Sequence, residues 1–305
     1  MTWKKIGLIL RPKDFKLKWW DSFGMDPTVI KLKGSIYRIF FCGRNKLNQS
    51  LIGYADLNLD NPTKILNISK KPVLSPGSLG AFDDNGVTAS CAVKVGKVLR
   101  LYYIGWKPKS TTRYSLMTGL AISKNNGKSF NRFSKAPILN LTNREPYSIL
   151  TAPYVMKVKK NKWIMWYVSC EKWVNENYPT YNIKHAFSED GLKWKQHGNI
   201  SINLKKNERA VARPCVLYEN KTFKMWYCYE TKVGQYKIGY AESKNGTSWI
   251  RKDSKANISC GKKNSWDGEM IAYPYVVKHK NKKFMFYNGN TYGKEGVGLA
   301  INEDN

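Results

Sequence analysis

The chain has 305 residues, and its 52 Lys and Arg against 22 Asp and Glu give a formal charge of +30. Its 11 Trp, 19 Tyr and 11 Phe are enough large side chains to form a core. No segment approaches the roughly 20 apolar residues of a membrane-spanning helix, and residues 1–5 lack the features of a secretory signal. We therefore expect a cytoplasmic protein forming a single domain over residues 1–305.

The cysteines and histidines point away from a metal or a cofactor. The six Cys form no C-x-x-C pair, which is the usual mark of zinc ribbons and redox motifs. His185, His197 and His279 show no metal-ligand spacing. The sequence contains no nucleophile elbow, phosphate-binding loop or dinucleotide motif. We predict no metal, no cofactor, and cysteines that serve as small apolar side chains.

The positive charge is dispersed in short lysine runs, such as those at 157–160 and 278–283. These runs fall at predicted hairpin turns, so a solvated rim is the simplest interpretation. No recognition-helix pattern appears, and we expect no specific nucleic-acid partner. A basic surface attracts anions, which leaves acidic glycans, phosphorylated sugars or an anionic membrane surface as partners.

One segment occurs five times along the chain, at residues 26–31, 89–94, 152–157, 213–218 and 273–278. Its proline position falls at 27, 90, 153, 214 and 274, so the copies follow one another at intervals of 63, 63, 61 and 60 residues. The position is Pro in four copies and Ser90 in the second. A proline at the start of a strand is tolerated in a sheet, so each copy predicts the first strand of a repeated unit.

The same elements follow each copy in the same order. An aromatic strand comes next, at 37–41, 99–103, 163–167, 223–227 and 284–287. A third strand follows at 52–55, 118–121, 183–186, 238–241 and 297–300. In three units an Asn-Gly or Asp-Gly turn and a closing aromatic residue then come after, as in tight hairpins.

Five units of four short strands without helical periodicity predict an all-β protein, a five-bladed β-propeller with four-stranded antiparallel blades. The last unit ends near Ala300 and Ile301, before a fourth strand. The leading segment 3–10 precedes the first unit and is expected to supply that strand. Such a closure would hide sheet edges that otherwise promote aggregation.

In a propeller the first strand of each blade lines the central axis. The residues before the proline position, Asp26, Ala89, Ala152, Arg213 and Tyr273, are therefore expected to lie at one mouth of the axis. The loops just upstream contain carboxylates and aromatic rings. Aromatic faces stack on sugars, and paired carboxylates are what glycoside cleavage requires.

The five-fold repeat and the Met25-Asp26-Pro27 segment resemble the propellers of glycoside hydrolase families 43, 62, 32 and 68. The Ser-Glu-Asp-Gly turn ending at Trp194 is similar to turns of the family 130 group. The family 43 resemblance implies that Asp26 is the catalytic base. It also implies an Asp in the second copy and a Glu in the third, where this chain has Ala89 and Ala152.

Two of the three implied carboxylates are thus missing from their places. Asp26 is either a catalytic or sugar-binding carboxylate or a residue that orders the start of a strand. Glu145 shows no counterpart in the other copies, so we favour it as the acid partner. Glu171 is the other candidate acid, although Glu230 ends an equivalent strand.

Seven further residues are candidates for substrate binding. Arg213 suits a substrate carboxylate or phosphate unless it pairs with Asp26 or a loop acid. Asp84 shares its repeat position with Asp21 and Glu208, which favours a structural role. The set is Trp20, Asp84, Arg213, Trp266, Asp267, Glu269 and Tyr273.

The sequence predicts a carbohydrate-active enzyme, similar to a glycoside hydrolase or transglycosidase, that cleaves or transfers a glycosyl unit at the axis. The basic charge and the expected cytoplasmic location favour a place in surface-polysaccharide or glycolipid assembly. The alternative is a non-catalytic glycan-binding or scaffold propeller, which the missing carboxylates favour.

Overall fold

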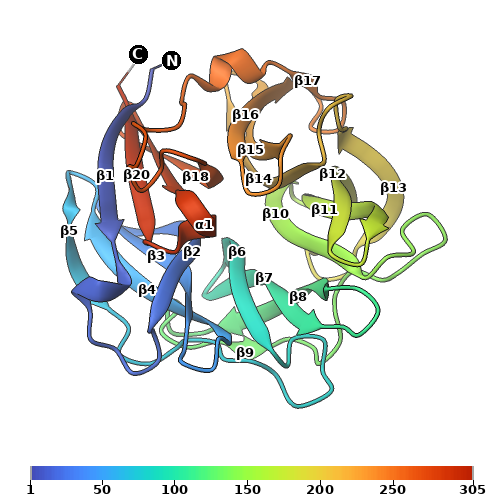
Figure 1. Cartoon of the computed structure of the whole chain (residues 1–305), viewed down its shortest axis with the longest axis horizontal. Helices are drawn as coiled ribbons and strands as arrows, with labels where there is room; N and C mark the ends of the chain where they lie inside the picture. Colours follow the sequence, from blue (N-terminus) through green and yellow to red (C-terminus); the bar gives the residue numbers. More distant parts are fainter. Residues whose placement is uncertain (1, 304–305) are drawn as a thin grey trace.

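The computed structural model describes residues 2–303, which form strands arranged around a central axis (Figure 1). Strand pairing within these residues gives five antiparallel groups of four strands, here called blades 1 to 5. The helical segments are short: η1 (Pro12–Asp14), η2 (Asp253–Ala256) and α1 (Asn290–Gly293). Among residues 2–303, no helix has the length and apolar character needed to cross a bilayer.

The blades follow one another along the chain. Blades 1 and 2 comprise β2 (Ser22–Lys33), β3 (Ile36–Arg44), β4 (Ser50–Asn58), β5 (Asn61–Ile68), β6 (Gly86–Val95), β7 (Val98–Pro108), β8 (Tyr114–Ser123) and β9 (Asn131–Arg132). Blades 3 and 4 comprise β10 (Ile149–Lys159), β11 (Lys162–Asn175), β12 (Tyr178–Ser188), β13 (Lys195–Ile202), β14 (Ala210–Glu219), β15 (Thr222–Glu230), β16 (Tyr236–Ser243) and β17 (Ile250–Arg251). Blade 5 comprises β18 (Ala272–His279), β19 (Lys282–Asn288), β20 (Val297–Asn302) and β1 (Lys4–Leu10).

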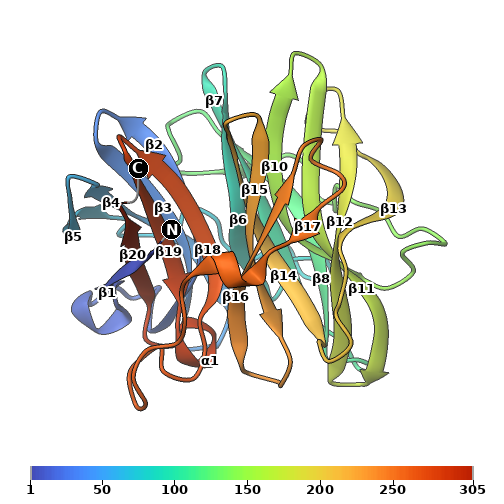
Figure 2. The ribbon, with the colours of Figure 1, turned by 90° about the horizontal axis from the view of Figure 1, so that it is seen from above.

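The first strand of each blade lies innermost, and the ring is closed. The innermost strands β2, β6, β10, β14 and β18 each contact the next, and β18 contacts β2. Seen from the side, these strands run along the axis (Figure 2). The predicted all-β propeller is confirmed.

The closing strand comes from the opposite end of the chain. β1 pairs antiparallel with β20, with Lys4 opposite Ile301 and Leu10 opposite Val297. The two ends of the chain therefore lie side by side (Figure 1). The prediction that the leading segment completes the last unit is confirmed, and the edge of β20 is covered.

The first strand of each blade has a β-bulge near its start. Asp26, Ala152, Arg213 and Tyr273 have left-handed backbones with φ of 55°, 47°, 56° and 56°, and the pairing skips a residue there. A proline follows each of them. The copy with Ser90 also has a bulge, but Ala89 is not left-handed. Because the repeats share this geometry, the fold rather than any one side chain requires it.

In blades 2 to 5 a buried tyrosine of the second strand donates a hydrogen bond to a carboxylate. We call this contact the Tyr–carboxylate clasp. Its members are Tyr103 with Asp83, Tyr167 with Glu145, Tyr227 with Asp253 and Tyr287 with Asp267. Blade 1 has Phe41 at the equivalent place, packed on Trp20 with ring centroids 4.5 Å apart. The clasp ties a loop to the face of its own blade.

Five of the six cysteines are buried, and all are reduced. Burial raises the pKa of Cys42 to about 11 and those of Cys91 and Cys215 to about 12. Because the thiolate is the reactive form, we expect native protein to react slowly with Ellman's reagent at pH 8, with half-buried Cys260 reacting first. Denatured protein should release six equivalents, and a rapid native reaction of several thiols would contradict the buried placement.

Candidate functional site

An ion pair crosses the axis where the innermost strands begin. Arg213 of β14 places its Nε 3.1 Å from Oδ1 of Asp26 of β2. Both side chains are at most 10% exposed. The guanidinium also donates from Nη1 to Oγ of Ser90 at 2.8 Å and to the carbonyl of Ala89 at 3.1 Å. One side chain thus connects blades 1, 2 and 4 at the axis.

The backbone around Asp26 is held from blade 5. The Asp26 amide donates to Oδ1 of Asn288 at 2.9 Å, and Nδ2 of Asn288 donates to the carbonyls of Gly24 and Gly296. Burial raises the pKa of Asp26, while the cations of Arg213 and Arg44 oppose the rise. A carboxylate with a raised pKa is a stronger base than an ordinary aspartate, which suits a role in proton transfer.

An aromatic wall stands beside this pair. Tyr273 lies in β18, the innermost strand of blade 5. Its ring centroid is 6.1 Å from that of Tyr236, and it stacks on the ring of Tyr292 with centroids 6.4 Å apart. Burial raises the pKa of all three phenols, which therefore stay neutral. The Arg213 guanidinium lies 5.9 Å from the Tyr273 ring.

Tyr292 reaches the wall because the loop that carries it is strained. Thr291 and Tyr292, in α1, have consecutive left-handed backbones with φ of 52° and 57°. Such conformations are uncommon in residues other than Gly, Asn and Asp and are concentrated at functional sites. The loops between the second and third strands of the other blades contain no helical turn in the described residues, so the repeat pattern carried no signal for Tyr292.

Blade 3 departs from the repeat at Lys184. The equivalent positions in the other blades are Gly53, Gly119, Gly239 and Gly298, each paired with the aromatic residue at the clasp position of the second strand. A Cβ on Gly119 would lie 2.3 Å from Tyr103, so these glycines make room for rings. Lys184 instead places a buried ammonium 2.9 Å from Glu171 and 3.9 Å from Glu145.

Two buried polar side chains lie beside Lys184 in the same sheet. Ser169 of β11 is paired in register with Asn182 of β12, on the face that carries Tyr167 and Lys184. Both are fully buried, and neither Ser169 Oγ nor the amide of Asn182 has a hydrogen-bond partner within residues 2–303. Buried polar atoms are usually satisfied, so this face of blade 3 has polar groups that the described fold leaves unused.

The structure separates Glu145 from the axial pair. Its carboxylate accepts from Tyr167 Oη at 2.9 Å and from Nε2 of Gln196 at 3.2 Å, so its partners lie on β11, β12 and β13. Contrary to the sequence-based premise, Glu145 has counterparts: Asp83, Asp253 and Asp267 complete the same clasp. The sequence did contain a signal for the clasp: in blades 2, 3 and 5 an acidic residue precedes the clasp tyrosine by 20 to 22 residues.

The other predicted contacts are distributed over the molecule. Trp20 is 2% exposed and packs against Phe41, and Trp266 covers Gly298 in blade 5. Asp267 is a clasp member that also pairs with Lys5 at 2.6 Å. Asp84 pairs with Lys107 at 3.1 Å and accepts from the Gly80 amide, and Glu269 is exposed. Of the seven predicted substrate-binding residues, only Arg213 and Tyr273 lie with Asp26 at the axis.

No cluster of three or more His, Cys, Asp or Glu that could hold a metal is present in the described part of the chain. The arrangement at the axis is instead one buried carboxylate, one fixed guanidinium and a tyrosine wall. A guanidinium and neutral phenols donate hydrogen bonds to hydroxyls or anions, and the carboxylate accepts them.

Several solved structures with a similar fold are glycoside hydrolases. One glycoside hydrolase shares 16% identity and superposes with a TM-score of 0.76 over 99% of this chain and 91% of that chain. A thermostable family 43 glycoside hydrolase shares 17% identity, with a TM-score of 0.70 over 92% and 88% of the two chains. The chain therefore has the glycoside-hydrolase type of β-propeller fold, as its sequence predicted.

No protein-family model matches the sequence. Over 309 residues, and 100% of both chains, it is 36% identical to uncharacterized protein MT1551 of Mycobacterium tuberculosis strain CDC 1551 / Oshkosh. It is 35% identical over the same extent to uncharacterized protein Rv1502 of strain ATCC 25618 / H37Rv. The chain belongs to the family of these two proteins.

Proposed function

We propose that the protein is a carbohydrate-active enzyme that cleaves or transfers a glycosyl unit at the axial mouth. The observation that carries the proposal is the Asp26–Arg213 pair. It is a buried carboxylate of raised pKa, at the axial position that Asp26 shares with the family 43 pattern, and it faces a wall of tyrosines. Perturbed carboxylates beside aromatic surfaces favour sugar chemistry.

In this proposal Asp26 and Glu171 divide the proton transfers. Asp26 removes the proton from the attacking hydroxyl, which belongs to water in hydrolysis or to an acceptor sugar in transfer. The oxygen of that hydroxyl bonds to the anomeric carbon as the glycosidic C–O bond breaks. Glu171 enters this step as the carboxylic acid, protonated from solvent, and gives its proton to the leaving oxygen. The Lys184 ammonium, 2.9 Å away, stabilises the carboxylate that remains.

Glu171 is favoured over Glu145 as the second carboxyl because of its exposure. Its side chain is 37% exposed, whereas that of Glu145 is fully buried and bonded to Tyr167 and Gln196. Glu171 also lies near the end of β11 on the side of the ring where β10 begins, as Leu150 is paired with Ser169. A substrate can reach Glu171 without opening a clasp.

The second candidate function is a glycan-binding propeller without turnover. Two observations favour it: Asp26 and Glu171 are each held by a cation, and the places of the other family 43 carboxylates hold Ala89 and Ala152. In that case Arg213 and the tyrosines would bind a sugar and no bond would be broken.

Turnover of a panel of glycosides, including furanosides and acidic sugars, separates the two candidates. We expect Asp26→Asn to lower kcat by roughly 10²–10⁴-fold, the usual contribution of a general base, while sugar binding by calorimetry persists. Glu171→Gln should lower kcat similarly. Glu145→Gln is expected to lower the melting temperature instead, because it weakens a clasp.

The matched control is Glu189→Gln, which removes a carboxylate that is 81% exposed and should leave kcat unchanged. Sugar binding without turnover by the parent protein would establish the binding candidate. If Asp26→Asn kept full turnover, the catalytic centre would lie elsewhere.

A further inference from the structure

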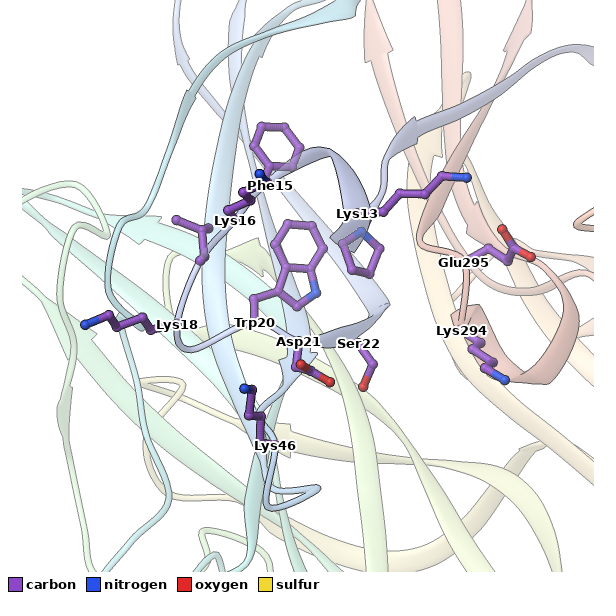
Figure 3. Close-up of a pocket in the computed structure, with 12 residues that line it drawn as sticks. Lys13, Phe15, Lys16, Lys18, Trp20, Asp21, Ser22, Lys46, Lys294 and Glu295 are labelled. Carbon is purple, nitrogen blue, oxygen red and sulfur yellow. The ribbon is translucent and has the colours of Figure 1, made fainter.

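A pocket of about 900 Å³ lies on blade 1, between the segment that precedes β2 and the segment that follows α1. Figure 3 shows Lys16 and Lys18 on one side of Trp20, Lys13, Lys294 and Glu295 on the other, and Lys46 below it. The half-buried ring of Phe15 stacks at 5.9 Å on the buried ring of Trp20, and both residues line the pocket.

The charge around this pocket is one-sided. Five lysines line it, and the acids that line it are Asp21 and Glu295. None of the five ammonium groups forms an ion pair or a hydrogen bond within residues 2–303, unlike Lys5, Lys184 or Lys205, which each hold a carboxylate. Like charges gathered around a concave surface without internal partners produce a local field that concentrates anions. The five are Lys13, Lys16, Lys18, Lys46 and Lys294.

The pocket adjoins the axial mouth along two segments. Ser22 lines the pocket and is paired in register with Arg44. The Arg44 guanidinium covers the Phe23 ring at 4.2 Å and is near enough to Asp26 to oppose the rise in its pKa. On the other side, Lys294 follows directly on α1, which carries Tyr292. Arg44 Nε is buried without a partner in the described chain.

We propose that this pocket binds the phosphate groups of a phosphorylated carbohydrate whose sugar reaches the axial mouth. Phosphate fits better than a carboxylate, because its charge near −2 and its several oxygens can bind ammonium groups from separate segments at once. The volume exceeds that of a single phosphate, and the half-buried ring of Phe15, which is stacked on buried Trp20, offers an apolar surface to the part of the ligand between phosphate and sugar.

A soluble ligand is favoured over a membrane surface by the shape of the site. The lysines border a hollow, so their charge is distributed around a recess that a compact anion can enter. A peripheral membrane surface would instead present basic and apolar side chains outward to bind a plane of headgroups. The inference that the ligand contains a sugar rests on the proposed function, whereas the inference that it contains phosphate does not.

The test is calorimetric titration of the full chain with inorganic pyrophosphate. The pocket variant is Lys13→Gln/Lys46→Gln/Lys294→Gln. The matched control, Lys97→Gln/Lys124→Gln/Lys206→Gln, removes the same charge from exposed lysines that lie outside this pocket. Losing even one charge-assisted hydrogen bond weakens binding by about tenfold or more. We expect at least that loss for the pocket variant and unchanged affinity for the control.

The proposal is overturned if the parent does not bind pyrophosphate, or if both variants weaken equally, which would indicate only net charge. A second arm uses sedimentation with phosphatidylserine–phosphatidylcholine vesicles. Vesicle binding that needs the pocket lysines, without pyrophosphate binding, would assign the pocket to a membrane and overturn the proposal. The pocket variant should still turn over a neutral glycoside, whereas Asp26→Asn should not. This difference separates a failure of the phosphate site from a failure of the proposed function.

Discussion

Replacing Arg213 with methionine is expected to lower the free energy of unfolding by about 3–5 kcal/mol, because removal of one partner leaves the other charge buried and unpaired. Arg213 is 7% exposed and holds Asp26, Ser90 and Ala89 across the axis, so water cannot take its place freely. Urea denaturation at pH 7 measures the loss. Turnover should be lost together with stability.

The loss in free energy of unfolding caused by Arg213→Met should also depend on pH. Burial already raises the pKa of Asp26 in the folded protein, and loss of the guanidinium removes the cation that opposes the rise. A raised folded-state pKa means that stability is greatest below the unfolded pKa of about 3.9 and is lost as pH rises through the folded value. The variant should therefore be closest to the parent near pH 4 and furthest from it at pH 7.

The double variant Arg213→Met/Asp26→Asn supplies the control. With no charge left at the axis it should recover much of the lost stability, and its pH dependence should resemble that of Asp26→Asn alone. Equal losses in the single and double variants would show that Arg213 acts through packing rather than through Asp26.

The second large effect is expected at Lys184. Lys184→Met removes the cation between Glu145 and Glu171 and leaves the fully buried Glu145 carboxylate with only Tyr167 and Gln196. Breaking a buried ion pair costs about 3 kcal/mol or more, although the 3.9 Å separation from Glu145 places this case at the lower end. Thermal or urea unfolding measures the loss of stability.

Kinetics of the same variant tests the positioning of Glu171. Because Lys184 acts through Glu171, Lys184→Met should lower kcat more than it changes KM, and Lys184→Arg should restore part of it. Adding Glu145→Gln to Lys184→Met should recover stability but not kcat. Recovery of both together would mean that Lys184 has a structural role only.

The repeat made the fold predictable. Each unit has the same strand order and spacing, so the innermost strands, the aromatic second strands and the closing role of residues 3–10 follow from aligning the copies. The pairing of Asp26 with Arg213 was open to prediction as well, since both precede a proline at the same place in two blades. Equivalent positions on the innermost strands of a propeller all face the central axis, so their side chains can meet there.

The rest of the site depends on residues that break the repeat or on loops of unequal length. The clasp was hidden because its carboxylate comes before the tyrosine in blade 3, at Glu145, and after it in blade 4, at Asp253. Lys184 was visible as the one residue that is not glycine in its column, but its meaning depends on the two carboxylates that burial brings to it. Tyr292 depends on a strained loop with no counterpart, and loop backbone angles of this kind leave no periodic signal.

The pairing of β1 with β20 has a consequence for how the protein is made. Lys4 leaves the ribosome long before its partner Ile301, because the strands of the other blades are synthesised between them. β1 must therefore wait, with its hydrogen-bonding edge open, while four blades assemble, and the entropic cost of closing so long a loop falls on the final step. Chains interrupted within the last blade would therefore expose a strand edge that can pair with other strands.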